Sequence, residues 1–241
     1  MAKRVLLIGQ EVGGVAKTTG VRGIAEAVPD APIFEIESTP RIREYEGRVT
    51  HFPVRADRAA IESSGGEAAR QEFDAPINAL ISVQMPHVVD IGANATGSLW
   101  ACFDDELVQG FAQAGIELAV LVVLTADPAA MAEGSKLLAM SKRWAAAQFV
   151  VENQVRGHID ADLLKRIAGG LPVTTLAKWN LEPHTVEFLQ ATGLQAIPAL
   201  TAADFAAEFG FNQARRMVND LKAFRLAVME AVLPAATWLA S

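Results

Sequence analysis

The sequence is poor in cysteine and has no histidine cluster, and both features limit the kinds of site it can hold. Cys102 is the single cysteine among 241 residues, so the chain can form no internal disulfide and no multi-cysteine metal site. The four histidines fall in no metal-ligand spacing such as His-Glu-x-x-His. An isolated cysteine is more often a small buried residue than a nucleophile, and we expect that role for Cys102.

Hydrophobic runs long enough to cross a bilayer are also missing. The longest, residues 116–125, is interrupted by Glu117 and is far shorter than the ~20 residues that a span requires. At the N-terminus, Lys3 and Arg4 precede an apolar run that is too short for a signal peptide. We therefore expect no transmembrane segment and a cytoplasmic protein.

Positive charge is scarce relative to negative charge. The formal net charge is −7, which argues against a broadly basic, nucleic-acid-binding surface and leaves only a local patch open. A hydrophobic content of 51% with 20% charged residues is typical of a compact globule. Repeats, low-complexity tracts and linkers are absent too. Predicted strands and helices alternate throughout, so we predict a single α/β domain over residues 1–241.

What the sequence does contain is a strand, a glycine loop and a helix in succession near its start. Residues 5–8 form a short apolar run, and a helix-compatible segment extends from Gly14 to about Ala27. The N–H groups of such a loop and the positive end of the following helix form an anion site. We expect Lys17 to reach the β- and γ-phosphates of a nucleotide, and the Thr18 hydroxyl to hold Mg²⁺.

The loop departs from the common pattern Gly-x-x-x-x-Gly-Lys-[Ser/Thr]. When that pattern is anchored on Lys17-Thr18, it requires glycine where the chain has Glu11 and Ala16. A Gly13-Gly14 pair precedes the lysine instead. The alternative interpretation is a strand–helix turn that binds nothing, and the surrounding elements have to decide between the two.

An alternating segment, residues 31–38, predicts a second strand that carries two glutamates. We expect Glu37 to face the phosphate–metal site, with Glu35 as the second choice. The alternative is that both side chains point to solvent from an edge strand. Residues 39–66 are polar and are a candidate switch segment that orders around nucleotide; the competing interpretation is a solvated surface.

A third strand ends in an aspartate. The run His87–Ala93 is apolar up to Asp90 and is followed shortly by Gly92. An aspartate at the carboxyl end of a buried parallel strand, beside the loop, binds Mg²⁺ through water in P-loop folds. Gly92 would let the backbone approach the γ-phosphate. Asp90 as a helix N-cap is the alternative.

The second half of the chain continues the alternation. Residues 116–124 predict a strand covered on both faces, and residues 148–151 predict another. Asn153 follows the latter where several P-loop families read the purine base, although asparagine is also a favoured turn residue. Apolar residues at helical spacing predict a helix over about 212–233, and we prefer docking on the sheet to a membrane-surface or partner role.

Taken together, the loop, the Pro-Ile-Phe-Glu-Ile-Glu-Ser strand and the Val-Val-Asp-Ile-Gly strand resemble the plasmid-stability and conjugal-transfer ATPases of the StbB/TraL type, relatives of the ParA/MinD ATPases with a deviant Walker A loop. The resemblance is clearest over residues 1–155. It implies a three-layer α/β P-loop NTPase fold, binding of ATP and Mg²⁺ with slow hydrolysis, and a plasmid-encoded DNA-binding or transfer protein as partner.

The resemblance also implies roles for individual residues. Catalytic roles would belong to Lys17, Asp90 and Glu37, and Mg²⁺ would bind at Thr18 and Asp90. The residues implied for nucleotide binding are Gly13, Gly14, Val15, Ala16, Lys17, Thr18, Thr19 and, on a looser match, Asn153.

Two departures from the family bear on mechanism. Val12 stands where many ParA-like proteins have a signature lysine that reaches the partner's nucleotide, which argues against hydrolysis in trans and against a nucleotide-sandwich dimer. Ala16 adds a methyl group to a tight turn, which implies weaker phosphate affinity. A catalytically silent adaptor is therefore the second hypothesis. A small-molecule kinase or ligase has no supporting motif, and a dinucleotide dehydrogenase lacks Gly-x-Gly-x-x-Gly.

Overall fold

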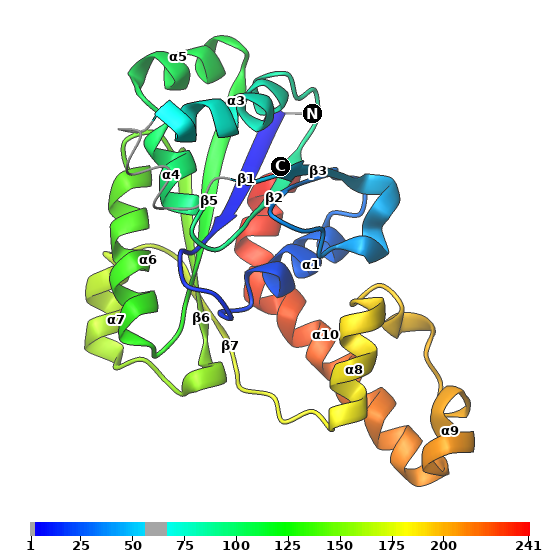
Figure 1. The fold of residues 1–241 in the computed structure, drawn as a ribbon. Coiled ribbons are helices and arrows are strands. Elements are labelled where there is room, and N and C mark those ends of the chain that lie inside the picture. The colour runs from blue at the N-terminus through cyan, green and yellow to red at the C-terminus, as the bar shows by residue number, and fades with distance from the viewer. Residues whose placement is uncertain (1–2, 56–66) are drawn as a thin grey trace.

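The computed structural model describes residues 3–55 and 67–241 and shows a parallel sheet between two layers of helices (Figure 1). In those residues the sheet has seven strands in the order β3-β2-β4-β1-β5-β6-β7. The strands are β1 (Lys3–Gly9), β2 (Ile33–Glu37), β3 (Val49–Pro53), β4 (His87–Ile91), β5 (Ile116–Leu124), β6 (Ala147–Asn153) and β7 (Val173–Leu176). Each neighbouring pair is parallel. The predicted three-layer α/β fold is confirmed.

The central strand β1 shows why the sheet needs helices on both sides. Val5 and Leu7 point into one hydrophobic cluster, whereas Leu6 and Ile8 point into the other. All four side chains are fully buried. Alternate residues of a strand face opposite sides, so an unbroken apolar run buries itself only between two helical layers.

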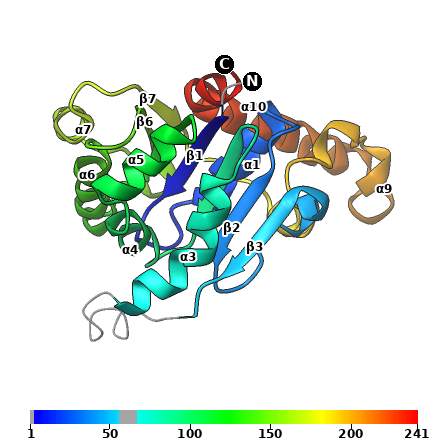
Figure 2. The ribbon, with the colours of Figure 1, turned by 90° about the horizontal axis from the view of Figure 1, so that it is seen from above.

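Helices from the middle of the chain cover one face of the sheet (Figure 2). They are α3 (Glu67–Ile81), α4 (Thr96–Ala101), α5 (Asp105–Gln113), α6 (Pro128–Ser141) and α7 (Ala161–Ala168). Aromatic side chains fill the space beneath them: the rings of Trp100 and Phe103 both pack edge-on against Trp144, with centroids 5.6 and 4.9 Å away.

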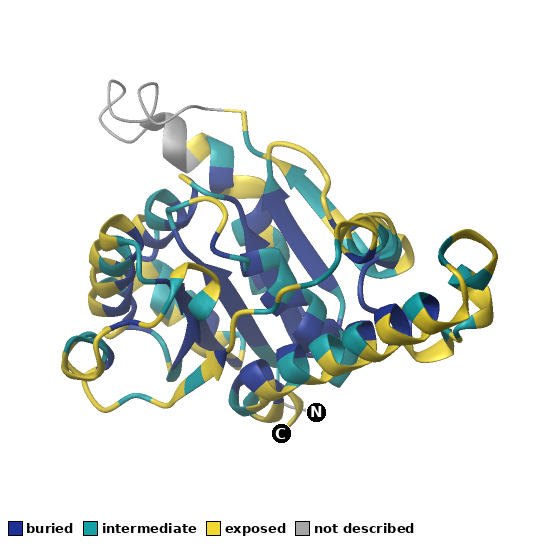
Figure 3. Ribbon diagram, turned by 90° about the horizontal axis from the view of Figure 1, so that it is seen from below, coloured by how far each residue is buried: buried dark blue, intermediate teal, exposed yellow. Residues whose placement is uncertain are grey.

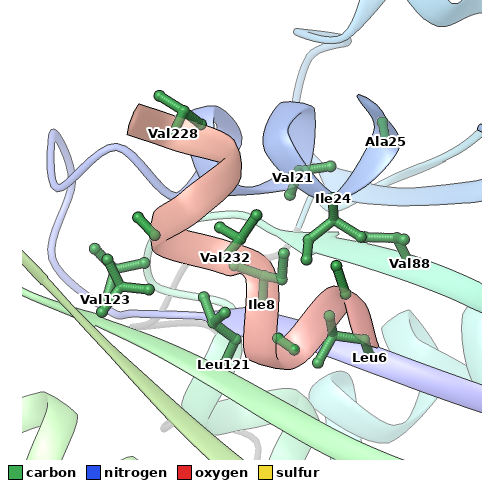
Figure 4. Packing of buried hydrophobic residues seen from close by; sticks show 14 of the residues in the cluster. Leu6, Ile8, Val21, Ile24, Ala25, Val88, Leu121, Val123, Val228 and Val232 are labelled. Carbon is green, nitrogen blue, oxygen red and sulfur yellow. The ribbon is translucent and has the colours of Figure 1, made fainter. Parts of the chain in front are cut away.

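The other face is covered by two helices that come from opposite ends of the chain, α1 (Lys17–Ala27) and α10 (Phe211–Ala240). Figure 4 shows Val21 and Ile24 of α1 beside Val228 and Val232 of α10, above the strands. The helices cross closely at Gly23, where an added Cβ would lie 2.8 Å from the Val228 side chain. This contact holds α1, and the loop before it, in place.

The amino-terminal half of α10 extends beyond the sheet. There it packs with α9 (Ala203–Phe209), whose Phe205 ring contacts Phe188 of α8 (Pro183–Thr192), and the three helices form an arm (Figures 1 and 3). Three 3₁₀ turns complete the described elements: η1 (Arg43–Arg48), η2 (Gln154–Arg156) and η3 (Ile197–Ala199). By length and composition alone, α10 is the one helix among the described residues that would suffice to cross a membrane. Its buried residues, however, pack in the core of this domain.

The structure corrects three boundaries. Strand β3 lies in the polar stretch interpreted as loop and helix surface, because it is a sheet edge with half-exposed side chains. Helix α1 begins at Lys17 and not at Gly14, because Ala16 has the left-handed backbone conformation. Helix α10 continues to Ala240. Part of the predicted switch segment, residues 56–66, lies outside the described residues.

Candidate functional site: a phosphate-binding cleft

A cleft of about 440 Å³ opens at the carboxyl ends of β1, β2 and β4. This volume is in the range of small-molecule sites. The cleft lies between the β1–α1 loop, the segment after β2, the loop after β4, and α8. Its lining residues are Gly13, Gly14, Val15, Ala16, Lys17, Thr18, Thr19, Arg22, Glu37, Arg41, Asp90, Ile91, Ala93 and Gln190.

The loop presents unpaired backbone donors to this cleft. Gly14 and Ala16 have φ angles of +74° and +70°, so the chain winds tightly just before α1 starts. Within residues 3–55 and 67–241, no acceptor bonds to the backbone N–H groups of Gly13 to Thr19. Such a winding loop, leading into the positive end of a helix, is an anion-binding concavity.

Two buried amide side chains fix the loop from behind. Gln10 donates from Nε2 to the carbonyls of Val123 (3.0 Å) and Ala130 (2.9 Å), and its Oε1 accepts from the N–H of Glu11 at 2.8 Å. Asn153 donates from Nδ2 to the carbonyl of Val15 at 3.0 Å. Strands β5 and β6 therefore hold the loop, and a phosphate would meet a preformed shape.

Lys17 lies under the loop with its side chain largely buried. Its Nζ donates to the carbonyl of Gln10 at 2.8 Å. Burial lowers the pKa of Lys17, while the negative charges of Asp90, Glu37 and Glu11 act to raise it. A cation held in a poorly solvated place, within reach of the cleft, gains from a bound anion.

Thr18 and Asp90 come together from different elements. The Thr18 hydroxyl, on the first turn of α1, donates to Oδ2 of Asp90 at 2.9 Å. Burial raises the pKa of Asp90 to about 6, and the hydrogen bond from Thr18 and the charge of Lys17 oppose that rise. A hydroxyl and a carboxylate are the hard oxygen donors that Mg²⁺ prefers.

This donor set fits Mg²⁺ bound together with a phosphate ligand. Among residues 3–55 and 67–241, no group of three or more His, Cys, Asp or Glu side chains is placed to hold a metal. Protein Mg²⁺ sites commonly use one or two carboxylates and complete the shell with phosphate oxygens and water. Asp90 and Thr18 would hold the ion, and a nucleotide would supply the remaining ligands.

The two candidate glutamates of β2 have different surroundings. Glu37 lines the cleft, and its carboxylate lies against Gly92, where an added Cβ would approach it to 2.8 Å. Glu35 is fully buried, and its Oε1 accepts from the N–H of Arg41 (2.6 Å) and of Ile42 (3.2 Å). Of the two, Glu37 is at the cleft.

The cleft thus brings together the predicted loop residues with Lys17, Thr18, Asp90 and Glu37. It does not include Asn153, whose buried amide is bonded to the back of the loop. Four further contributors were not predicted: Gln10 behind the loop, and Arg22, Arg41 and Gln190 in the lining. Arginines in the segment after β2 were a visible signal, whereas α8 is too distant in sequence to have been connected with the cleft.

The parallel sheet, with the loop between its central strand and α1, defines a three-layer α/β fold that carries a cleft and a glycine loop at the carboxyl edge of the sheet. Similar solved structures are MinD of Aquifex aeolicus (14% identity, 91% of this chain and 95% of that chain covered, TM-score 0.41), a ParA family ATPase of Chlorobium tepidum (14%, 93% and 99%, 0.40) and an ATP complex of McdA from Cyanothece (11%, 92% and 96%, 0.44). No family model and no curated protein matches the chain.

Proposed function

We propose that this protein is an ATP- and Mg²⁺-binding switch of the ParA/MinD type. One observation carries the proposal: free loop N–H groups, the Lys17 ammonium and the Thr18–Asp90 pair all meet in one cleft. Phosphate and Mg²⁺ together satisfy all three groups. A turn that binds nothing would have no reason to bury an ammonium and a carboxylate at its edge.

Each residue has a part in this proposal. The loop N–H groups and Lys17 bind phosphate oxygens, whereas Thr18 and Asp90 hold the metal. When bound, Mg²⁺ neutralises phosphate charge. Phosphoryl transfer depends largely on positioning and charge neutralisation, so weak hydrolysis requires no nucleophile from the protein. Glu37, whose carboxylate lies against Gly92, would orient a water molecule for attack on the γ-phosphate.

The contacts around Glu44 support a switch. Arg22 of the cleft lining forms an ion pair with Glu44 in η1. Gln195, which follows α8, donates to the backbone carbonyl of Glu44. Glu44 therefore links the cleft, η1 and the arm. A nucleotide that moves Arg22 would change the contacts that hold the arm against η1.

Thermal unfolding tests the nucleotide site. ATP with Mg²⁺ at 100 times its dissociation constant should stabilise the wild-type protein by about 2.7 kcal/mol. Lys17→Ala should abolish this gain. Lys136→Ala is the matched control, since that side chain is 60% exposed on α6. Equal stabilisation of wild type and Lys17→Ala would remove the proposal.

We further propose a cytoplasmic role in plasmid stability or conjugal transfer, with a plasmid-encoded DNA-binding or transfer protein as partner. The resemblance of the three strand and loop motifs to StbB/TraL-type proteins supports this part. Genes for a small DNA-binding protein and a relaxase beside this one would strengthen it. The proposal includes a homodimer, which light scattering with a non-hydrolysable ATP analogue would detect.

A catalytically silent adaptor is the second candidate. Three observations favour it: Val12 replaces the signature lysine, Ala16 adopts a strained conformation, and Lys17 is bonded to the loop itself. Phosphate release, measured with and without candidate partners, separates the two. Binding without turnover under both conditions supports the adaptor.

A further inference from the structure

The cleft contains a cation beyond Lys17 that is free to reach a ligand. Of the two arginines in the lining, Arg22 is only 17% exposed and is bound to Glu44 and to the carbonyl of Arg41. Arg41 is 57% exposed, and its guanidinium forms an ion pair with Glu37, with Nε 3.3 Å from Oε2. A single ion pair whose arginine is exposed to solvent is weak, so a phosphate can replace the carboxylate.

The backbone of Arg41 is fixed although its side chain is exposed. Its N–H donates to Oε1 of the buried Glu35 at 2.6 Å, and its carbonyl accepts from Nη2 of Arg22 at 3.3 Å. A buried carboxylate that holds a loop is costly to maintain, and here it aims one side chain at the cleft mouth. Glu35 is thus a positioning residue for Arg41.

In the proposed binding mode, the γ-phosphate lies near Gly92, and Arg41 is connected to that position through Glu37. Its partner Glu37 packs against Gly92, in the loop that follows the Asp90 strand. The charge of Arg41 also contributes to lowering the pKa of Lys17, so the two cations repel each other across the cleft. An anion between them would relieve this repulsion.

Val12 cannot supply such a cation. It is partly buried and packs against the hydrophobic cluster beneath α1 and α10. On the basis of the proposed function, we propose that the Arg41 guanidinium binds the γ-phosphate of ATP within its own chain and thereby supplies the positive charge that Val12 lacks. A guanidinium is well suited to this contact because its donors match two phosphate oxygens at once.

Calorimetric titration of ATP and ADP, each with Mg²⁺, tests this proposal. Arg41→Ala should weaken ATP binding at least tenfold and change ADP binding less than twofold. Arg41→Lys should retain part of the ATP affinity. Arg43→Ala removes the same charge two residues away, from an exposed side chain outside the lining, and should leave both affinities unchanged.

Loss of Arg41 also removes the ion-pair partner of Glu37. The measurement is therefore repeated in a Glu37→Gln background, where no unpaired negative charge remains at this position. An ATP-specific loss in both backgrounds supports the contact. Equal losses for ATP and ADP, or a loss that vanishes in the Glu37→Gln background, would overturn it. If the wild-type protein binds neither nucleotide, the proposed function itself has failed. Wild-type binding that Arg41→Ala leaves intact defeats only the Arg41 assignment.

Discussion

The polar groups at the carboxyl edge of the sheet differ between its two halves in how fully they are hydrogen-bonded within the chain. On the β1–β2–β4 half, the N–H groups of Gly13 to Thr19 have no acceptor among the described residues, and within the same residues the Asp90 carboxylate accepts only from the Thr18 hydroxyl. On the β5–β6–β7 half, buried Glu152 accepts from the N–H of Ile159 at 2.8 Å and from Gln154 at 2.9 Å. Asn153 is likewise bonded at both ends of its amide.

The polar groups of the β5–β6–β7 half support the structure, whereas those of the β1–β2–β4 half are available to bind a ligand. Buried polar groups are normally hydrogen-bonded, and the β5–β6–β7 half follows that rule. The β1–β2–β4 half departs from it at the place where a phosphate and a metal would satisfy the free groups. Substitutions on the supporting half should therefore change stability, whereas those on the binding half should change affinity.

The largest effect should come from Gln10, the support that joins the two halves. Gln10→Leu leaves the buried carbonyls of Val123 and Ala130 without this donor, so we expect a loss of about 3 kcal/mol of unfolding free energy. Urea denaturation measures it. Gln84→Leu, at an exposed position, should stay within about 0.5 kcal/mol. A Gln10 variant as stable as that control would show that the loop needs no such support.

The next effect concerns Asp90 and pH. Its pKa in the folded protein, about 6, lies above the value of 3.8 for an unperturbed carboxyl. The folded state therefore binds more protons between these values, and its stability falls as pH rises through that window, by on the order of 3 kcal/mol.

Chemical denaturation from pH 4 to 7, without nucleotide, tests this sign. Relative to Asp90→Asn, the wild-type protein should lose stability as pH rises. Affinity for ATP·Mg²⁺ should weaken below pH 6, because metal binding requires the carboxylate. Parallel stability curves for the two proteins would contradict the assignment of a buried, proton-binding Asp90.

Asn153 gives a smaller and more discriminating test. Asn153→Ala removes the donor to Val15, and we expect a loss of about 1–2 kcal/mol of unfolding free energy. If the residue acts only as support, the ratio of ATP to GTP affinity should stay the same. A change of that ratio by more than tenfold would instead show that Asn153 reads the base.

The smallest effect should come from Ala16. Its left-handed backbone costs roughly 1 kcal/mol, partly offset by the entropy that glycine loses on folding. Ala16→Gly should therefore raise the melting temperature slightly and tighten ATP binding a few-fold. Ala223→Gly on the exposed side of α10 should do the opposite, by about 1 kcal/mol. Equal effects of both changes would show that Ala16 is unstrained.

Sequence patterns predicted most of the sheet, because buried parallel strands are apolar runs and β1, β4 and β5 are such runs. The pattern failed at β3, because the Val49–Pro53 segment is a half-exposed edge strand in which the two faces differ little in burial. It also left Glu35 and Glu37 as alternatives. The structure separates them: Glu35 accepts from the chain at Arg41, whereas Glu37 faces the cleft.

By itself, the sequence determined the parallel α/β core and the order of loop, lysine, threonine and aspartate, because apolar runs and motif spacing are local along the chain. Only the tertiary structure decided which polar groups are hydrogen-bonded within the chain and which remain available to a ligand. Gln10 and Asn153 bond to residues more than 100 positions away. Arg41 and Gln190 reach the cleft from different elements. Such pairings depend on packing between distant segments, and no local pattern encodes them.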